Sequence, residues 1–140
     1  MSRVFWDTNL FIYLIEDAGT LSKRVVELRE RMLARGDQLA TSAFTLGELL
    51  VKPVERGRED LAHAYREALS SLAELIPFDA RAAVAYARIR QDRTLRPPDA
   101  IQLACAAAAT VDLFITNDDR LSRKVVPGIQ FISALDRAPL

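Results

Sequence analysis

The pattern of apolar and polar residues along this chain predicts a regular succession of strands and helices. Short, mostly apolar stretches predict five strands, at Val4–Trp6, Gln38–Thr41, Leu75–Phe78, Asp112–Thr116 and Ile129–Ile132. Longer stretches with helical spacing or capping residues predict helices over Leu10–Glu16, Leu21–Ala34, a segment from Ser42 through Glu48, Glu59–Leu72, Asp79–Arg90 and Asp99–Thr110. Because strands alternate with helices, we expect an α/β fold with a central, mostly parallel sheet flanked by helices.

Proline and glycine residues mark the expected ends of two elements. Pro53 and Gly57 are expected to disrupt the helix that carries Glu48. Arg96-Pro97-Pro98 stops the chain before the last predicted helix, which is nearly free of charge and should therefore be central and buried. The chain contains no linker, repeat or low-complexity segment, so residues 1–140 are expected to form one domain.

Composition narrows the class of protein. Half of the 140 residues are hydrophobic and 27% are charged, which is ordinary for a soluble globular domain. No apolar stretch is long enough to span a membrane, and the first residues lack the order of a signal peptide, so we expect a cytoplasmic protein. The single cysteine, Cys105, excludes an intrachain disulfide and is expected to be a small buried hydrophobe.

Four acidic residues stand beside apolar segments, where a charge is unusual. Asp7 ends the first predicted strand, Glu48 interrupts an apolar run, Asp99 opens the uncharged helix, and Asp118 follows the fourth strand by two residues. Carboxylates avoid apolar surroundings unless they are paired, hydrogen-bonded or bound to a cation. The pattern therefore suggests one shared acidic pocket of the kind that binds hard cations such as Mg²⁺.

The predicted topology permits these four side chains to converge. Asp7 and Asp118 follow strands, so both should emerge at the carboxyl edge of the sheet, where sites of open parallel sheets form. Asp99 at a helix N-terminus faces the same edge, and Glu48 lies in the first turns of its helix. Each residue taken alone also has a purely structural interpretation: Asp7 as a helix cap, Asp99 as a partner of a helix dipole, Asp118 as a turn residue.

Four short motifs occur in an order and spacing that resemble a known family. They are Asp7-Thr8-Asn9, Gly47-Glu48-Leu49, Pro98-Asp99-Ala100-Ile101-Gln102-Leu103-Ala104 and Thr116-Asn117-Asp118. Together with the length and the alternating layout, they resemble the PIN-domain nucleases, and most closely the VapC-type toxin ribonucleases of toxin–antitoxin pairs. Each motif is short, but four in sequence make chance a poor explanation. The Lys52-Pro53 pair and Gly57 are also typical of this subgroup.

The resemblance implies a role for each matching position. Asp7 and Asp99 would be the principal ligands of Mg²⁺, with Mn²⁺ as a possible substitute. Glu48 would complete the acidic set, and Asp118 would occupy the fourth acidic position. Thr8, Asn9 and Thr116 would orient the carboxylates. Asp119 directly follows Asp118, and Asp118 is preferred because it matches the family's Thr-x-Asp spacing.

The resemblance also implies an activity and partners. A metal-held water would hydrolyse an RNA phosphodiester, leaving a 5′-phosphate and a 3′-hydroxyl. The partners would be the RNA substrate, a VapB-like antitoxin that offers an arginine to the acidic pocket, and a second copy of the chain in a homodimer. Although the net charge is zero, arginines cluster before Asp99, so Lys52, Arg93 and Arg96 are candidate RNA contacts.

Other interpretations of the acidic set differ in what they require. A receiver domain needs a paired acidic residue beside Asp7, a phosphoacceptor aspartate near mid-chain and a late lysine, and Thr116-Asn117 stands where the lysine would be. A haloacid-dehalogenase phosphatase needs a second aspartate where Asn9 stands. A PIN-like domain that only binds RNA or protein remains the alternative, although such a module would have lost a carboxylate.

Overall fold

A five-stranded parallel sheet forms the centre of the molecule. The computed structural model describes residues 1–140, and its strands pair in the order β3-β2-β1-β4-β5, all of them parallel. The strands are β1 (Arg3–Trp6), β2 (Gln38–Ser42), β3 (Glu74–Ile76), β4 (Leu113–Thr116) and β5 (Phe131–Ala134). The predicted α/β class with a parallel sheet is therefore confirmed.

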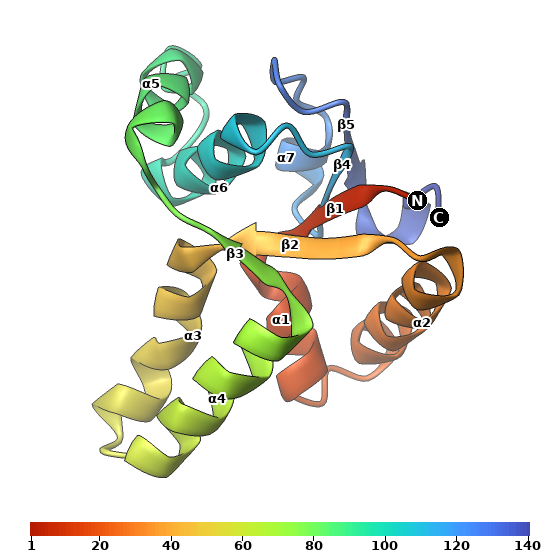
Figure 1. Cartoon of the computed structure of the whole chain (residues 1–140), viewed down its shortest axis with the longest axis vertical. Helices are drawn as coiled ribbons and strands as arrows, with labels where there is room; N and C mark the ends of the chain where they lie inside the picture. Colours follow the sequence, from red (N-terminus) through yellow and green to blue (C-terminus); the bar gives the residue numbers. More distant parts are fainter.

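Seven α-helices and one short 3₁₀ helix cover both faces of this sheet (Figure 1). Their bounds are α1 (Thr8–Ile15), α2 (Thr20–Arg35), α3 (Ala43–Glu55), α4 (Glu59–Leu72), α5 (Ala80–Ile89), α6 (Pro97–Ala108), α7 (Asp119–Ser122) and the 3₁₀ helix Leu135–Arg137. Helices α1 to α4 pack against one face, and α5, α6 and α7 pack against the other. The result is a three-layer α/β/α arrangement.

Alternating side chains of the central strand supply both halves of the core. Val4 and Trp6 point into the cluster formed with α1 to α4, whereas Phe5 points into the cluster on the opposite face. The ring of Phe5 stacks on Phe114 of β4, with centroids 5.0 Å apart. Val4, Phe5 and Trp6 are fully buried, so after Arg3 the sequence of β1 is continuously apolar rather than alternating, as expected of a strand in a parallel sheet.

The first strand of the chain, β1, lies at the centre of the sheet. From β1 the chain moves outward through β2 to β3, and then returns to the other side of β1 to form β4 and β5. The direction of winding therefore reverses between β1 and β4. Crevices beyond the carboxyl ends of parallel strands form at such a reversal, so the topology itself marks the region after Trp6 and Thr116.

Several predicted boundaries needed correction. Pro53 does not end α3, which continues to Glu55, and behind the proline Arg56 N–H still donates to the Lys52 carbonyl (3.1 Å). The helix ends just before Gly57, whose φ of +65° is the left-handed conformation that glycine tolerates best, and Arg58 N–H closes this end by donating to the Pro53 carbonyl (2.8 Å).

The outer strands also lie elsewhere than predicted. Strand β3 starts at Glu74 and ends before Pro77, which has no N–H to donate. Strand β5 begins two residues later than predicted because its register is set by pairing with β4, Leu113 opposite Phe131. Helix α7, a single turn, was not predicted. No helix of the protein is both long enough and apolar enough to span a membrane.

Candidate active site

Asp7 lies buried at the centre of the carboxyl edge. It follows β1 directly and is the N-cap of α1, where its carboxylate accepts a hydrogen bond from Thr8 N–H (2.9 Å). Its second oxygen accepts from Thr116 Oγ1 at the end of β4 (2.8 Å), across the point where the winding reverses. Asp7 is only 9% exposed. A buried carboxylate with two such donors is held in one orientation.

Burial raises the pKa of Asp7 to about 6, even though the hydrogen bonds from Thr116 and Thr8 act in the opposite direction. The negative charges of Asp99 and Glu48 add to the rise. Both residues therefore lie near enough to Asp7 for their charges to act on it. A group titrating near pH 6 can bind either a proton or a cation under ordinary cellular conditions.

Glu48 reaches the same region from α3. Its Oε1 accepts a hydrogen bond from Thr8 Oγ1 (2.6 Å), which links the glutamate to the residue after Asp7. The side chain of Glu48 is otherwise exposed. Helix α3 is aimed at the site because Ser42, the last residue of β2, caps it by accepting from Thr45 N–H (3.1 Å).

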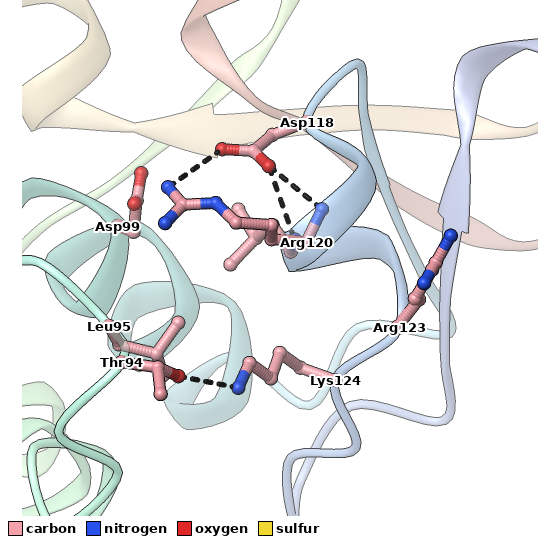
Figure 2. A pocket seen from close by; sticks show the side chains of 8 residues that line it. Thr94, Leu95, Asp99, Asp118, Arg120, Arg123 and Lys124 are labelled. Atoms are coloured by element: carbon pink, nitrogen blue, oxygen red, sulfur yellow. Dashed lines mark hydrogen bonds and ion pairs between the residues drawn. The ribbon is translucent and has the colours of Figure 1, made fainter.

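Asp99 and Asp118 lie together beside a cavity of about 340 Å³ (Figure 2). Asp99 is in the first turn of α6, and its pKa is raised by partial burial and by the charge of Asp118, while Arg96 and Arg120 lower it. Asp118 is the N-cap of α7, where its Oδ1 accepts from the backbone N–H of Arg120 (2.9 Å). The cavity is lined by Thr94, Leu95, Asp99, Asp118, Arg120, Leu121, Arg123 and Lys124.

The four carboxylates form an acidic row in the sense that each interacts with the next through its charge. The charges of Glu48 and Asp99 act on Asp7, and the charge of Asp118 acts on Asp99. No group of three or more Asp, Glu, His or Cys side chains is close enough together to hold a metal ion by itself. A cation in this row would therefore bind one or two carboxylates directly and complete its coordination with water or substrate oxygens.

The predicted orienting residues divide into two groups. Thr8 and Thr116 both donate to carboxylates of the site, and Thr116 Oγ1 also accepts from Asp118 N–H (3.1 Å). Asn9 makes no hydrogen bond to any of the four carboxylates, and its buried Oδ1 has no partner. Asp119 points outward, with its side chain 78% exposed and paired with Arg137 at 3.8 Å.

Gln102 is the central residue that sequence reasoning missed. It is 2% exposed, and its Nε2 lies within hydrogen-bond distance of Thr45 Oγ1 (2.7 Å), Thr8 Oγ1 (2.8 Å) and Asp7 Oδ1 (3.4 Å). Its Oε1 accepts from Ser42 Oγ. A sequence signal existed, because Gln102 is the only polar residue of this helix besides Asp99 and stands three positions after it, on the same helical face.

The candidate RNA contacts lie on different elements around the acidic row. Arg96 is the N-cap residue of α6, and its charge acts on Asp99. Arg93 is exposed in the turn before α6. Lys52 lies on α3, pairs weakly with Glu16 at 3.7 Å, and lines a groove together with Glu48. Arg120, which sequence reasoning did not single out, lies 3.7 Å from Asp118, and its charge also acts on Asp99 (Figure 2).

Comparisons with known proteins agree on one family. The profile of the PIN domain matches residues 4–126. A sequence 33% identical over 121 residues is Ribonuclease VapC23 of Mycobacterium tuberculosis (strain CDC 1551 / Oshkosh); the match covers 85% of this chain and 95% of that protein. A second sequence of the same name, from strain H37Rv, matches equally well.

Solved structures share the fold. VapBC2 from Rickettsia felis, bound to a DNA fragment from its promoter, superposes with a TM-score of 0.75 at 18% identity, covering 94% of this chain and 98% of that one. DNA-bound VapBC from Salmonella typhimurium superposes with a TM-score of 0.73 at 23% identity, covering 96% and 99%. A toxin–antitoxin complex from Klebsiella pneumoniae has a TM-score of 0.68 at 25% identity, covering 90% and 94%.

Proposed function

This chain belongs to the PIN-domain family, and we propose that it is a cytoplasmic, metal-dependent endoribonuclease, the toxin of a VapBC-type toxin–antitoxin pair. The observation that carries the proposal is Asp7, a carboxylate buried beside Asp99 and Glu48. Folding gains nothing from repulsion among these charges, whereas a divalent cation would relieve it. The match to a protein named a ribonuclease supports the same conclusion.

The donors of the site fit Mg²⁺ or Mn²⁺. All four are carboxylates, the hard oxygen ligands that these ions prefer, and Mg²⁺ commonly uses only one or two carboxylates while keeping several waters. No three carboxylates of the site are close enough together to surround an ion, which agrees with this mode of Mg²⁺ binding. Asp7 and Asp99 would hold the ion, with Glu48 and Asp118 at either end of the row.

The chain's own residues would divide the hydrolysis of a phosphodiester among them. When bound, the ion would activate a water and offset the charge that develops on the phosphate oxygens. Asp7 is kept in place by Thr116 and by the first turn of α1, so its position would not change when it meets a cation. Glu48, which accepts a hydrogen bond from Thr8, would orient the attacking water.

The acidic row also gives a reason for a protein partner. The three solved structures above are toxin–antitoxin complexes or VapBC assemblies. For this chain we propose a VapB-like antitoxin that inserts an arginine among the carboxylates and satisfies the charge that a metal would satisfy. Full inhibition by an antitoxin fragment without any basic residue would refute the arginine insertion. Homodimerisation belongs to the same proposal and is checked by sedimentation equilibrium.

A cleavage assay tests the enzyme. Purified protein is incubated with a 5′-labelled single-stranded RNA in Mg²⁺, in Mn²⁺ and in excess EDTA, and the product ends are mapped. We expect cleavage with either metal, none in EDTA, and a loss of at least about 100-fold in Asp7→Asn and Asp99→Asn. Asp119→Asn is the matched control, because Asp119 points outward, and should cleave like the wild type.

Two outcomes would contradict the proposal. Cleavage that persists in EDTA would exclude the metal-dependent mechanism. RNA binding without cleavage by the wild type, under all metal conditions, would assign the chain to the PIN-like binding modules instead.

A further inference from the structure

Three basic side chains line the cavity next to Asp99 and Asp118, but only one of them faces these carboxylates. Lys124 Nζ is bound to Asp92 (2.8 Å) and to Thr94 Oγ1 (2.7 Å), on the side of the cavity away from the acidic row. Arg123 extends away from both carboxylates in Figure 2. The guanidinium of Arg120 lies between Asp99 and Asp118. Among the basic side chains that line this cavity, Arg120 is therefore the one that lies beside both carboxylates.

The guanidinium of Arg120 keeps its donors free. Its contact with Asp118 is long, 3.7 Å from Nη2 to Oδ2, and its side chain is 63% exposed. The guanidinium makes no hydrogen bond within the protein. An exposed ion pair at this distance contributes little to folding, so Arg120 can turn toward another anion at small cost.

The backbone of Arg120, in contrast, is held in place. Asp118 caps α7 and accepts from Arg120 N–H (2.9 Å), and the next residue, Leu121, is 2% exposed in the core on that side of the sheet. The base of the Arg120 side chain is thus fixed relative to Asp118. A mobile guanidinium on a rigid anchor samples only a small volume above the carboxylates.

We propose that Arg120 binds the phosphodiester that the protein cleaves, holding a non-bridging oxygen of the RNA next to the carboxylate row. This inference rests on the proposed ribonuclease function and names the residue that brings the substrate to it. The acidic row would repel an RNA phosphate if no cation lay among its four carboxylates. A planar guanidinium offers two parallel N–H donors to a phosphate, which a lysine cannot do.

The same contact would favour the reaction itself. Charge builds up on the phosphate oxygens as the attacking water approaches phosphorus, and a fixed donor strengthens as that charge grows. Arg120 would move from Asp118 to the phosphate as the substrate arrives. The exchange replaces a long carboxylate contact by a closer, charge-assisted hydrogen bond.

The test compares Arg120→Ala, Arg120→Lys and Arg123→Ala, with Arg123 as the matched control on the same segment. A fluorescein-labelled single-stranded RNA is used in two assays: binding by anisotropy in EDTA at several salt concentrations, and single-turnover cleavage in Mg²⁺. Circular dichroism melting confirms that each variant folds. Manganese affinity, from electron paramagnetic resonance, reports any effect on the carboxylates themselves.

We expect Arg120→Ala to weaken metal-free RNA binding, to flatten its salt dependence by about one phosphate contact, and to slow cleavage by about 100-fold. Arg120→Lys should recover part of the binding and less of the cleavage. Arg123→Ala should change either quantity by less than about fivefold. Manganese affinity should not fall in any variant, because no carboxylate is removed.

The inference is overturned if Arg120→Ala binds RNA in EDTA as tightly as the wild type, with the same salt slope, or if Arg123→Ala is equally impaired. A change in manganese affinity with unchanged RNA binding would reduce Arg120 to a partner of Asp118. These outcomes are distinct from failure of the proposed function, in which the wild type itself would cleave no RNA.

Discussion

At the scale of single residues, Asp7 combines two roles that conflict electrostatically. As the N-cap of α1 it satisfies a backbone N–H, which favours the ionised carboxylate. Burial and the charges of Asp99 and Glu48 favour the protonated acid and prevail, so its pKa rises to about 6. Helix capping alone would not require an aspartate to be buried beside two other acids.

This conflict predicts a pH-dependent stability of the metal-free protein. Because the pKa of Asp7 is higher in the folded chain than in the unfolded one, its stabilising contribution is complete below about pH 4 and is lost as pH rises through 6. In EDTA, Asp7→Asn should therefore melt at a higher temperature than the wild type at pH 7.5, and the difference should shrink toward pH 5. Calorimetry of both proteins between pH 5 and 7.5 measures this difference in melting temperature. A difference of equal size at all pH values would contradict a raised pKa of Asp7.

Gln102 connects three elements through side chains alone. It joins the end of β2, the first turn of α1 and helix α3 by hydrogen bonds to Ser42, Thr8 and Thr45. Thr8 in turn holds Glu48. Gln102 is therefore a positioning residue, which acts on the site through the groups that touch the carboxylates.

Truncation of the Gln102 side chain should lower the stability of the fold. Gln102→Ala removes one hydrogen-bond partner from each of three buried hydroxyls, those of Ser42, Thr8 and Thr45, at a cost of about 1–3 kcal/mol in the free energy of unfolding. Gln91→Ala is the control, because Gln91 is exposed and bonds only to the carbonyl of Ala87; its effect should stay within about 0.5 kcal/mol. Urea unfolding measures both. Equal losses in the two variants would show that the network contributes nothing.

At the scale of elements, the junctions between strands and the helices that follow them determine where the site residues lie. Asp7 and Asp118 follow strands, Ser42 is the last residue of one, and each of the three caps the next helix. The local interpretation of Asp7 as a capping residue is therefore correct, and it coexists with a place in the acidic row. Asp118, interpreted locally as a turn residue, instead caps the short helix α7. Capping by Asp7 and Ser42 was predictable because it depends on residues a few positions apart.

The contact between α6 and the turn before β5 depends on a glycine. Gly128 has φ of +96°, and a Cβ there would lie 2.9 Å from the carbonyl oxygen of Ala107 and 3.2 Å from its Cα. Gly128→Ala should therefore destabilise the fold by about 2 kcal/mol or more, through backbone strain and the clash with α6. Gly47→Ala is the matched control.

Gly47 lies inside α3 at a negative φ, with open space where a Cβ would be. The alanine there should stabilise the helix by up to about 1 kcal/mol. Thermal melting of both variants gives the comparison. Similar melting temperatures for Gly128→Ala and the wild type would mean that the turn moves freely away from α6.

At the scale of the whole molecule, the acidic row lies across the boundary between two halves of the sheet. Glu48 follows β2, Asp7 follows β1, and Asp118 follows β4 on the other side of the reversal. A cation bound in this row would connect groups from both halves. Ligands that bind only the folded state stabilise it in proportion to their occupancy.

Divalent cations should therefore raise the melting temperature of the whole domain. At about 100 times the dissociation constant, the gain is about 2.7 kcal/mol for one site. Asp99→Asn should lose most of this increase, whereas Asp119→Asn should keep it, because Asp119 lies outside the row. Differential scanning fluorimetry with Mg²⁺, Mn²⁺ and EDTA measures the shift. An increase of equal size in Asp99→Asn would place the cation elsewhere.

The sequence by itself determined the class of fold, most helix and strand positions, and the residues of the acidic row. These features depend on periodicity, caps and short motifs, which involve residues close together in the chain. Prediction from the sequence failed where an element boundary depends on residues far apart in the chain. The register of β5 is set by β4, and α3 continues through Pro53 although the local signal is a break.

Only the tertiary structure decided how the row is assembled. Gln102 meets Thr8, 94 positions away, and Thr116 meets Asp7, 109 positions away. Arg120 comes to lie between Asp99 and Asp118 because α7 begins soon after the end of β4, with Asp118 as its cap (Figure 2). Such contacts arise from the reversal of winding between β1 and β4, which no local pattern records. The sequence motifs identify the four carboxylates, whereas the folded chain determines their order and brings Arg120 beside Asp99 and Asp118.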